Sequence, residues 1–327
     1  MLGDFFGEAL NEKMDTNIIP IQVVHTAKSS AWFQTTTDES RGFIQPHGLD
    51  ELWFHTGTAC NLACPFCLEG SKPGDQRLQI LRFEDAKPFI DEAITLGVKQ
   101  FSFTGGEPFV AKDMVHILDY ALQYRPCMVL TNATEPLIKR LKQIEPLLLH
   151  ANSLHFRVSL DHFDATKHDM GRGEGMFNLA LEGLLELHEM GFKVSVANQM
   201  LKDFTPAETT LRFIEIFKNA GLPEDLHRVE FPDFHPPGLA VKTPQISANC
   251  MMSYQSEDSR RAFMCAFSKM IVKDKGRMRV YACTLVDDDS DYSLGETLTA
   301  SMTQAVSMKH HRCYSCFKYG ASCSELK

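Results

Sequence analysis

The chain has 327 residues and a net charge of −9; 44% of its residues are hydrophobic and 23% are charged. This length suits a barrel with a smaller appended unit, and the acidic balance disfavours nucleic acid as a partner. No apolar run is long enough to span a membrane, and the N-terminal residues carry acids where a secretory signal needs basic groups. We therefore expect a cytoplasmic protein with no membrane partner.

Residues 1–48 carry no motif that we can interpret, and we treat them as an N-terminal extension. From residue 51 onward, short β-prone runs alternate with helical periodicities. The predicted strands are Leu52–Thr56, Gln100–Thr104, Cys127–Thr131, Leu154–Leu160, Lys193–Met200 and Arg228–Phe231. The predicted helices are Phe83–Leu96, Asp113–Leu122, Leu137–Ile144, Met176–Met190 and Pro206–Asn219. This alternation predicts an α/β unit of parallel strands with right-handed crossovers, which we place at residues 49–240.

Polar residues follow the ends of the last predicted strands. Asn198 and Gln199 end the fifth strand, Glu230 ends the sixth, and Asp233 and His235 come directly after it. In barrels of parallel strands, the reactive residues sit at the C-terminal strand ends. We therefore expect these side chains to face a substrate, with Glu230 and His235 as candidate catalytic residues.

Ten cysteines in a chain without an export signal indicate a reducing compartment, where thiols bind metals more often than they form disulfides. Three of them, Cys60, Cys64 and Cys67, form a CxxxCxxC loop after the first predicted strand. Three thiolates can hold three irons of a four-iron cluster and leave the fourth iron open to a small ligand. A structural zinc site with a fourth ligand elsewhere is the alternative.

A second motif, Gly105-Gly106-Glu107-Pro108, ends the second predicted strand. Glycines expose backbone groups to a ligand because they carry no Cβ. Together, the cysteine loop and this motif resemble the radical S-adenosylmethionine (SAM) enzymes. The resemblance implies a partial (β/α)6 TIM-like barrel and an open iron that binds SAM. It also implies reductive cleavage of SAM to a 5′-deoxyadenosyl radical that abstracts a substrate hydrogen, with an electron donor such as flavodoxin or ferredoxin.

The resemblance further implies which residues bind SAM. Phe66, which precedes the third cysteine, would pack against the adenine, and Gly105 and Gly106 would approach the methionyl amine, with Glu107 accepting from it. Ser159, at the end of the fourth predicted strand, and Arg172, in the segment His168-Asp-Met-Gly-Arg172, would contact the carboxylate and the ribose. Asn132 stands in a Thr-Asn-Ala segment where many relatives have Thr-Asn-Gly.

Four further cysteines, Cys265, Cys283, Cys313 and Cys316, lie in the C-terminal region. Their number suffices to hold a second, auxiliary four-iron cluster, and zinc is the competing ligand. Residues 260–320 resemble the twitch appendage, a shortened SPASM domain, of radical SAM enzymes with one auxiliary cluster. We therefore place a small cysteine-rich α+β domain at residues 241–327.

Cys250 and Cys323 are left over and are candidates for a fifth cluster ligand or for hydrogen-atom donors, whereas Cys127 suits a core position. Three functions stay open. The first is two-electron oxidation or cross-linking of a small molecule or peptide, with the auxiliary cluster taking the second electron. The second is a redox-neutral epimerase with a cysteine donor, and the third is a non-catalytic iron–sulfur redox or maturation protein. Residues 1–48 are too short for a winged-helix peptide-binding domain, which favours a small substrate or a substrate held without such a module.

Overall fold

The computed structural model describes residues 28–232, 238–239, 241–320 and 324. Three residues singled out from the sequence, Asp233, His235 and Cys323, lie outside the described residues. None of the helices in the described part of the chain combines the length and the apolar character that crossing a bilayer requires.

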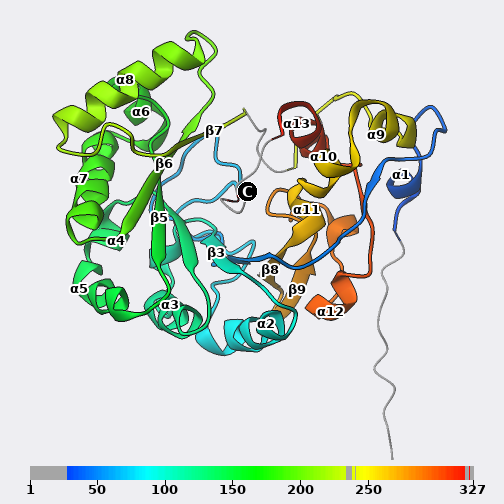
Figure 1. Cartoon of the computed structure of the whole chain (residues 1–327), viewed down its shortest axis with the longest axis horizontal. Helices are drawn as coiled ribbons and strands as arrows, with labels where there is room; N and C mark the ends of the chain where they lie inside the picture. The colour runs from blue at the N-terminus through cyan, green and yellow to red at the C-terminus, as the bar shows by residue number, and fades with distance from the viewer. Residues whose placement is uncertain (1–27, 233–237, 240, 321–323, 325–327) are drawn as a thin grey trace, which may run out of the picture.

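Eight strands form the central sheet in the order β7-β6-β5-β4-β3-β2-β8-β9, and all neighbours except β8 and β9 are parallel. The first six parallel strands are β2 (Glu51–His55), β3 (Gln100–Thr104), β4 (Cys127–Thr131), β5 (Leu154–Ser159), β6 (Lys193–Gln199) and β7 (Arg228–Phe231). The α/β fold with a parallel, barrel-like sheet is therefore confirmed. Figure 1 shows the helices arranged along the outer side of this curved sheet.

The outer helices are α2 (Phe83–Thr95), α3 (Met114–Leu122), α6 (Ala165–Arg172), α7 (Met176–Glu189) and α8 (Pro206–Asn219). The predicted helix at residues 137–144 is instead two short helices, α4 (Glu135–Ile138) and α5 (Leu141–Ile144). The break falls at Arg140, whose backbone leaves the helical region with φ −113° and ψ 2°. Its guanidinium donates to the Lys112 carbonyl at 3.1 Å, so a tertiary contact replaces helix continuity there.

Aromatic side chains fill the space between the sheet and its helices. Phe54, Phe101 and Phe103 project from neighbouring strands, and Phe213 comes from helix α8; each is almost completely buried. Burying one such side chain stabilises the fold by about 1.5–3 kcal/mol. Apolar, β-prone residues recur along each of these strands, and this pattern made the strands predictable.

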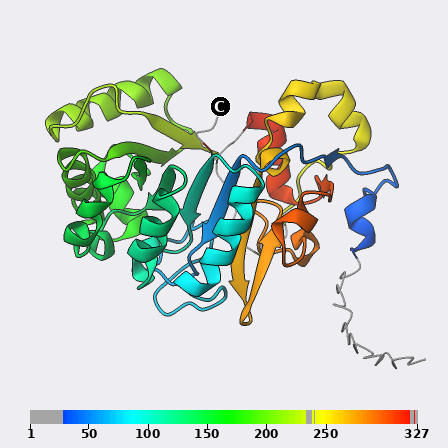
Figure 2. The same ribbon diagram turned by 60° about the horizontal axis from the view of Figure 1, so that its bottom comes forward.

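The C-terminal region extends the same sheet. Strand β8 (Ser268–Asp274) pairs in parallel with β2, and β9 (Arg277–Tyr281) returns antiparallel to it through Lys275 and Gly276, both with positive φ. Figure 2 shows this hairpin beside the barrel strands. We did not predict β8. The boundary that we placed at residue 240 therefore does not separate two sheets, because a backbone ladder crosses it.

Short elements complete the C-terminal region, and the described part of the N-terminal extension packs onto them. These elements are α9 (Ala248–Tyr254), α10 (Glu257–Arg261), α11 (Met264–Phe267), α12 (Leu298–Ser301), α13 (His311–Tyr319) and the 3₁₀ helix η3 (Ser290–Tyr292). Two more 3₁₀ turns, η1 (Pro108–Val110) and η2 (Glu145–Leu149), lie in the barrel.

Following α1 (Ser30–Phe33), strand β1 (Phe43–Ile44) pairs antiparallel with β10 (Val306–Ser307). Trp32 packs edge-on against Tyr292 with ring centres 4.9 Å apart. Residues 28–48 thus pack with the cysteine-rich region.

Candidate cofactor site and auxiliary cysteine site

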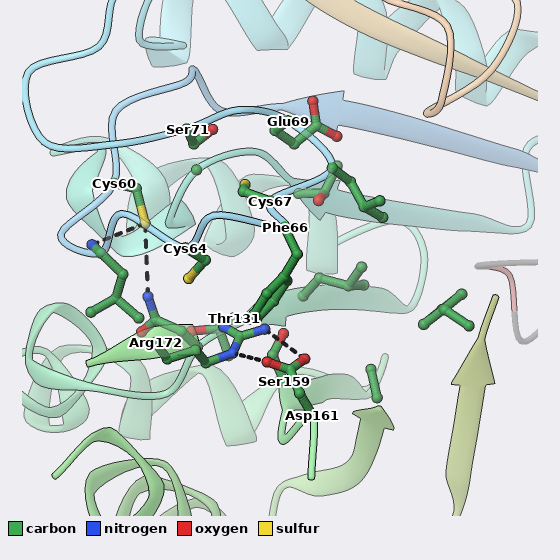
Figure 3. Close-up of a pocket in the computed structure, with 18 of the residues that line it drawn as sticks. Cys60, Cys64, Phe66, Cys67, Glu69, Ser71, Thr131, Ser159, Asp161 and Arg172 are labelled. Carbon is green, nitrogen blue, oxygen red and sulfur yellow. Dashed lines mark hydrogen bonds and ion pairs between the residues drawn. The ribbon is translucent and has the colours of Figure 1, made fainter. Parts of the chain in front are cut away.

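A cavity of about 1010 Å³, including its open mouth, lies at the C-terminal ends of the parallel strands. Every strand from β2 to β7 contributes to its lining, either directly or through the loop that follows it. The predicted residues that line it are Cys60, Cys64, Phe66, Cys67, Gly105, Gly106, Asn132, Ser159, Arg172, Asn198 and Gln199. Figure 3 shows the three cysteines on one side of this space, facing Arg172, Ser159 and Asp161. Sequence-distant residues thus meet at the edge where barrel chemistry is expected.

The cysteine loop has the donor set for a metal cluster. All three thiols are half-buried, and burial raises the pKa of Cys60 to about 12 and also raises the pKa of Cys64. All three cysteines line the same cavity, so their thiolates can share one cluster there.

The two glycines bring strand β3 against the cysteine loop. A Cβ on Gly106 would lie 2.2 Å from the Ala59 carbonyl oxygen, and one on Gly105, whose φ is 142°, would lie 2.7 Å from Thr56 Oγ1. The backbone nitrogens of Gly106 and Glu107 donate to the loop carbonyls of Gly57 and Ala59 at 2.8 and 3.1 Å. The glycines therefore position the cysteine loop in addition to lining the cavity, and their contact with SAM stays a prediction.

Glu107 lies beneath the cavity and not among its lining residues. Its carboxylate is 1% exposed and accepts hydrogen bonds from the Phe109 backbone at 3.2 Å, from Thr131 Oγ1 at 2.9 Å and from the Asn132 backbone at 2.8 Å. Burial raises its pKa to about 7 in spite of these donors. In this arrangement Glu107 orders the end of β4, and the predicted acceptance from the SAM amine is not visible in its geometry.

Asn132 connects the end of β4 to the cysteine loop. Its Nδ2 donates to Asn61 Oδ1 at 3.0 Å and lies 4.0 Å from the Cys60 sulfur. The next residue, Ala133, adopts the left-handed φ of 53° that a glycine would take more easily. Helix α7 makes room for it, because a Cβ on Gly183 would lie 2.2 Å from the Ala133 carbonyl oxygen.

Arg172 reaches the cavity from the end of helix α6. Its guanidinium binds the Asp161 carboxylate in a bidentate manner, with Nη2 donating to Oδ1 at 3.0 Å, and it lies 5.9 Å from the centre of the Phe66 ring. Gly171 allows this packing, since a Cβ there would lie 2.1 Å from the Phe66 ring. Asp161 follows the end of the fourth predicted strand, where we expected candidate residues, whereas Gly171 is a site residue that we did not predict. A polar residue directly after a predicted strand end, and a glycine beside Arg172, were the available signals.

The candidate substrate residues are divided by the structure. Asn198 and Gln199 line the cavity, together with Phe231. The Glu230 side chain does not line it: its carboxylate pairs with Arg228, which also donates to Asn198 Oδ1 at 2.8 Å. The catalytic role that we predicted for Glu230 therefore lacks geometric support. His235 lies outside the described residues.

The four C-terminal cysteines line a second cavity of about 380 Å³, together with apolar residues and Tyr292. Burial raises the pKa of the Cys265 and Cys283 thiols and raises that of Cys313 to about 12. Four thiols on one cavity form a donor set that suits either a four-iron cluster or a zinc ion.

A buried lysine lies beside this second cavity. Lys269 is 0% exposed, and its ammonium donates to the carbonyl oxygens of Cys265 at 3.1 Å and Ser268 at 3.0 Å. Burial lowers its pKa to about 8, while the thiols of Cys265 and Cys283 act in the opposite direction. A buried cation without a carboxylate partner is costly unless a nearby anion balances it. The chemistry of the site thus suits an anionic thiolate-bound centre.

The remaining described cysteines lie outside both cavities. Cys250 is half-buried, with its sulfur 3.5 Å from Ser247 Oγ, and it packs on the same apolar cluster as Cys313 and Cys316. Cys127 is buried in the barrel core, as we expected. Cys323 lies outside the described residues, so the prediction that it donates hydrogen or binds a cluster stays a prediction.

The sequence profile of the Radical SAM superfamily matches residues 54–214, the stretch that holds the cysteine loop, the glycine motif and Arg172. Residues 54–214 thus match the radical SAM superfamily, whose members bind a four-iron four-sulfur cluster and SAM. The predicted resemblance and these two cofactors are therefore confirmed, and the similarities below support the SPASM/twitch-type subgroup.

Among characterised proteins, the chain is 32% identical to the mycofactocin maturase MftC of Mycolicibacterium smegmatis, over 42% of this chain and 35% of that protein. It is 27% identical to the GTP 3′,8-cyclase of Tolumonas auensis, over 57% of each chain. Among solved structures, Streptococcus suis SuiB bound to its precursor peptide SuiA matches with a TM-score of 0.57 at 13% identity, over 79% of this chain and 65% of that one. The chain thus covers about a third of the length of the mycofactocin maturase and a little under three fifths of the length of the GTP cyclase.

Proposed function

We propose that the chain is a radical SAM enzyme that oxidises or cross-links a peptide and uses an auxiliary iron–sulfur cluster to accept the second electron. The observation that carries this proposal is the single cavity in which the three loop cysteines face Phe66, Ser159 and Arg172. A cluster bound there would supply the electron that cleaves SAM and so provide the hydrogen-abstracting radical.

The side chains of the cavity would bind and orient SAM. Phe66 offers an aromatic face that Gly171 keeps in place, and Arg172 offers guanidinium hydrogens next to Asp161. Ser159 supplies a hydroxyl at the end of β5, and the glycines hold the cysteine loop at its distance from these groups. Precise placement of reacting groups accounts for a large part of enzymatic rate enhancement.

The four C-terminal cysteines line one cavity, and the buried ammonium of Lys269 lies beside it. An anionic, thiolate-bound centre would balance that charge. We favour a four-iron cluster over zinc there, because the first site already requires iron–sulfur assembly.

This second centre favours net oxidation. In that reaction the substrate loses one hydrogen atom to the SAM-derived radical, and then one electron to the auxiliary cluster and one proton to solvent. The electron taken from the donor, such as a flavodoxin or ferredoxin, is balanced by the electron that leaves through the auxiliary cluster. An epimerase needs a hydrogen donor at the cavity; Cys250 does not line it, and the other candidate donor, Cys323, lies outside the described residues.

The proposed substrate class is a peptide. From the sequence alone we favoured a small substrate or a substrate held without a winged-helix module. A relative named as a maturase and a fold neighbour solved with its precursor peptide support a peptide. Because another relative is named as a GTP cyclase, a nucleotide is the alternative substrate class to test.

Anaerobic reconstitution followed by iron and sulfide counting and a 5′-deoxyadenosine assay tests the proposal. We expect about eight irons per chain, the sum of two four-iron clusters. Replacing Cys60, Cys64 and Cys67 by alanine should leave about four irons and abolish SAM cleavage, whereas Cys250→Ala is a control that keeps both. Cleavage by the triple variant would refute the cofactor assignment, and about four irons plus one zinc in the parent protein would refute the auxiliary cluster.

Mass and isotope analysis separates the reactions once a substrate is found among peptides encoded by neighbouring genes. Oxidation gives a product two hydrogens lighter, with no deuterium at the attacked carbon when the reaction runs in heavy water. An unchanged mass in ordinary water with one deuterium gained in heavy water would establish the epimerase instead.

A further inference from the structure

Five polar side chains lie between the two cysteine sites, and we call them the inter-site network: His55, Glu69, Arg77, Asp287 and Arg312. Glu69 follows Cys67 by two positions and lines the first cavity (Figure 3), while Asp287 follows Cys283 by four. The network therefore joins the loop of the SAM-binding cysteines to the loop of the auxiliary cysteines.

The first pair in the network fixes the direction of one hydrogen bond. His55 Nδ1 accepts from the Gly57 backbone at 3.2 Å, so the ring proton lies on Nε2 and is donated to Glu69 Oε2 at 3.0 Å. His55 is 0% exposed and Glu69 is 8% exposed. The end of β2 is thereby bound to the segment directly after the cysteine loop.

Two arginines then bind both loops at once. Arg77 donates through Nη1 to Asp287 Oδ2 at 2.7 Å and through Nη2 to the Glu69 carbonyl at 3.0 Å. Arg312, which precedes Cys313, donates to the carbonyls of Leu285 and Leu68, both at 3.0 Å. Planar guanidinium groups suit such two-sided bridging because their donors diverge in fixed directions.

The residue types also resemble a metal site, but the charges argue against one. Ligand atoms of His55, Glu69 and Asp287 lie within 4.8 Å of one another, and Asp287 Oδ1 has no hydrogen-bond partner among the described residues. Arg77, however, already occupies the other oxygen of Asp287, and Arg312 acts on Glu69. Two guanidinium groups balance two carboxylates, so a cation would have to displace Arg77.

We propose that the inter-site network fixes the separation and orientation of the SAM-binding loop and the auxiliary-cluster loop, with Arg77 as its central positioning residue. This proposal rests on the proposed function, because the distance matters only when both sites hold clusters. Electron transfer between a substrate in the first cavity and the second centre depends steeply on that distance. The two loops come from segments more than 200 positions apart in sequence, so tertiary cross-links such as these hold them in register.

The test compares Arg77→Gln with Arg279→Gln in the full chain. Arg279 is the matched control because its side chain is similarly exposed, 30% against 35%, and its ion pair with Glu296 lies outside the network. In reconstituted, dithionite-reduced protein, pulsed electron paramagnetic resonance measures the distance distribution between the two clusters. In the metal-free protein, hydrogen exchange measures the opening of the loops at residues 68–72 and 284–288.

We expect Arg77→Gln to broaden the intercluster distance distribution and to speed exchange in both loops about tenfold, with Arg77→Lys intermediate and Arg279→Gln unchanged. An unchanged distance distribution, or faster exchange confined to the loop next to Arg77, would overturn the proposal. If Arg77→Gln does not fold, Asp287→Asn is measured in the same way and the same outcomes decide. If the parent protein holds only one cluster, the proposed function is wrong. The hydrogen-exchange result in the metal-free protein still decides whether the network holds the two loops together.

Discussion

Gly106→Ala is the sharpest test of how the cysteine loop is held. The added Cβ would lie 2.2 Å from the Ala59 carbonyl oxygen, where ordinary contact begins at 3.4 Å, so the loop or the strand end must move by about 1.2 Å. The contacted oxygen belongs to the backbone, so no side-chain rotation can relieve the overlap. The same Ala59 carbonyl oxygen also accepts the hydrogen bond from the Glu107 backbone nitrogen. Overpacking of this kind costs about 1–3 kcal/mol of stability, and displacements of about 1 Å in active sites reduce rates about 100-fold.

The assay is 5′-deoxyadenosine formation by reconstituted protein with dithionite and SAM, measured together with iron content and the thermal midpoint. Gly48→Ala is the control, because no atom lies within 4 Å of the added Cβ and the backbone there is unstrained. We expect Gly106→Ala to retain the auxiliary cluster and lose about 100-fold in SAM cleavage. Equal cleavage rates and iron contents in the two variants would refute the conclusion that the glycine pair positions the loop.

Three further predictions follow from buried charges. Burial raises the pKa of Glu107 to about 7, so the folded protein binds this proton more tightly than the unfolded chain does. The free energy of unfolding should therefore fall by about 3 kcal/mol between pH 4.5 and 7. Urea unfolding of the metal-free protein should show this fall, and Glu107→Gln should lack it; equal pH slopes would contradict the assignment. Arg172→Lys cannot keep the bidentate contact with Asp161 and should weaken SAM binding about tenfold at unchanged iron content, as titration with SAM would reveal. Lys269→Met removes the buried ammonium beside Cys265 and should lower the reduction potential of the auxiliary cluster in a redox titration while leaving the first cluster unchanged.

Local patterns determined most of the barrel. The six parallel strands were predicted because short β-prone runs alternate with helical periodicities along the chain. Helix α8 begins at Pro206 as predicted, and the capping box of Thr205 and Glu208 that starts it lies within one turn of the chain. The helix at residues 137–144 was wrong because a tertiary hydrogen bond of Arg140 interrupts it, and such contacts leave no periodic signal. Strand β8 was missed because its partner β2 lies more than 200 residues earlier.

For the site, the spacing of Cys60, Cys64 and Cys67 and the Gly-Gly-Glu-Pro segment sufficed to indicate the superfamily, since a loop of fixed length dictates which thiols can share one cluster. Only the tertiary structure decided how those parts are held. It put Glu107 beneath the cavity, gave Arg172 the carboxylate of Asp161, and paired Glu230 with Arg228. Sequence specifies which groups a loop carries, but burial and the choice of ionic partner depend on segments brought together from across the chain, and those distances exist only in the folded protein.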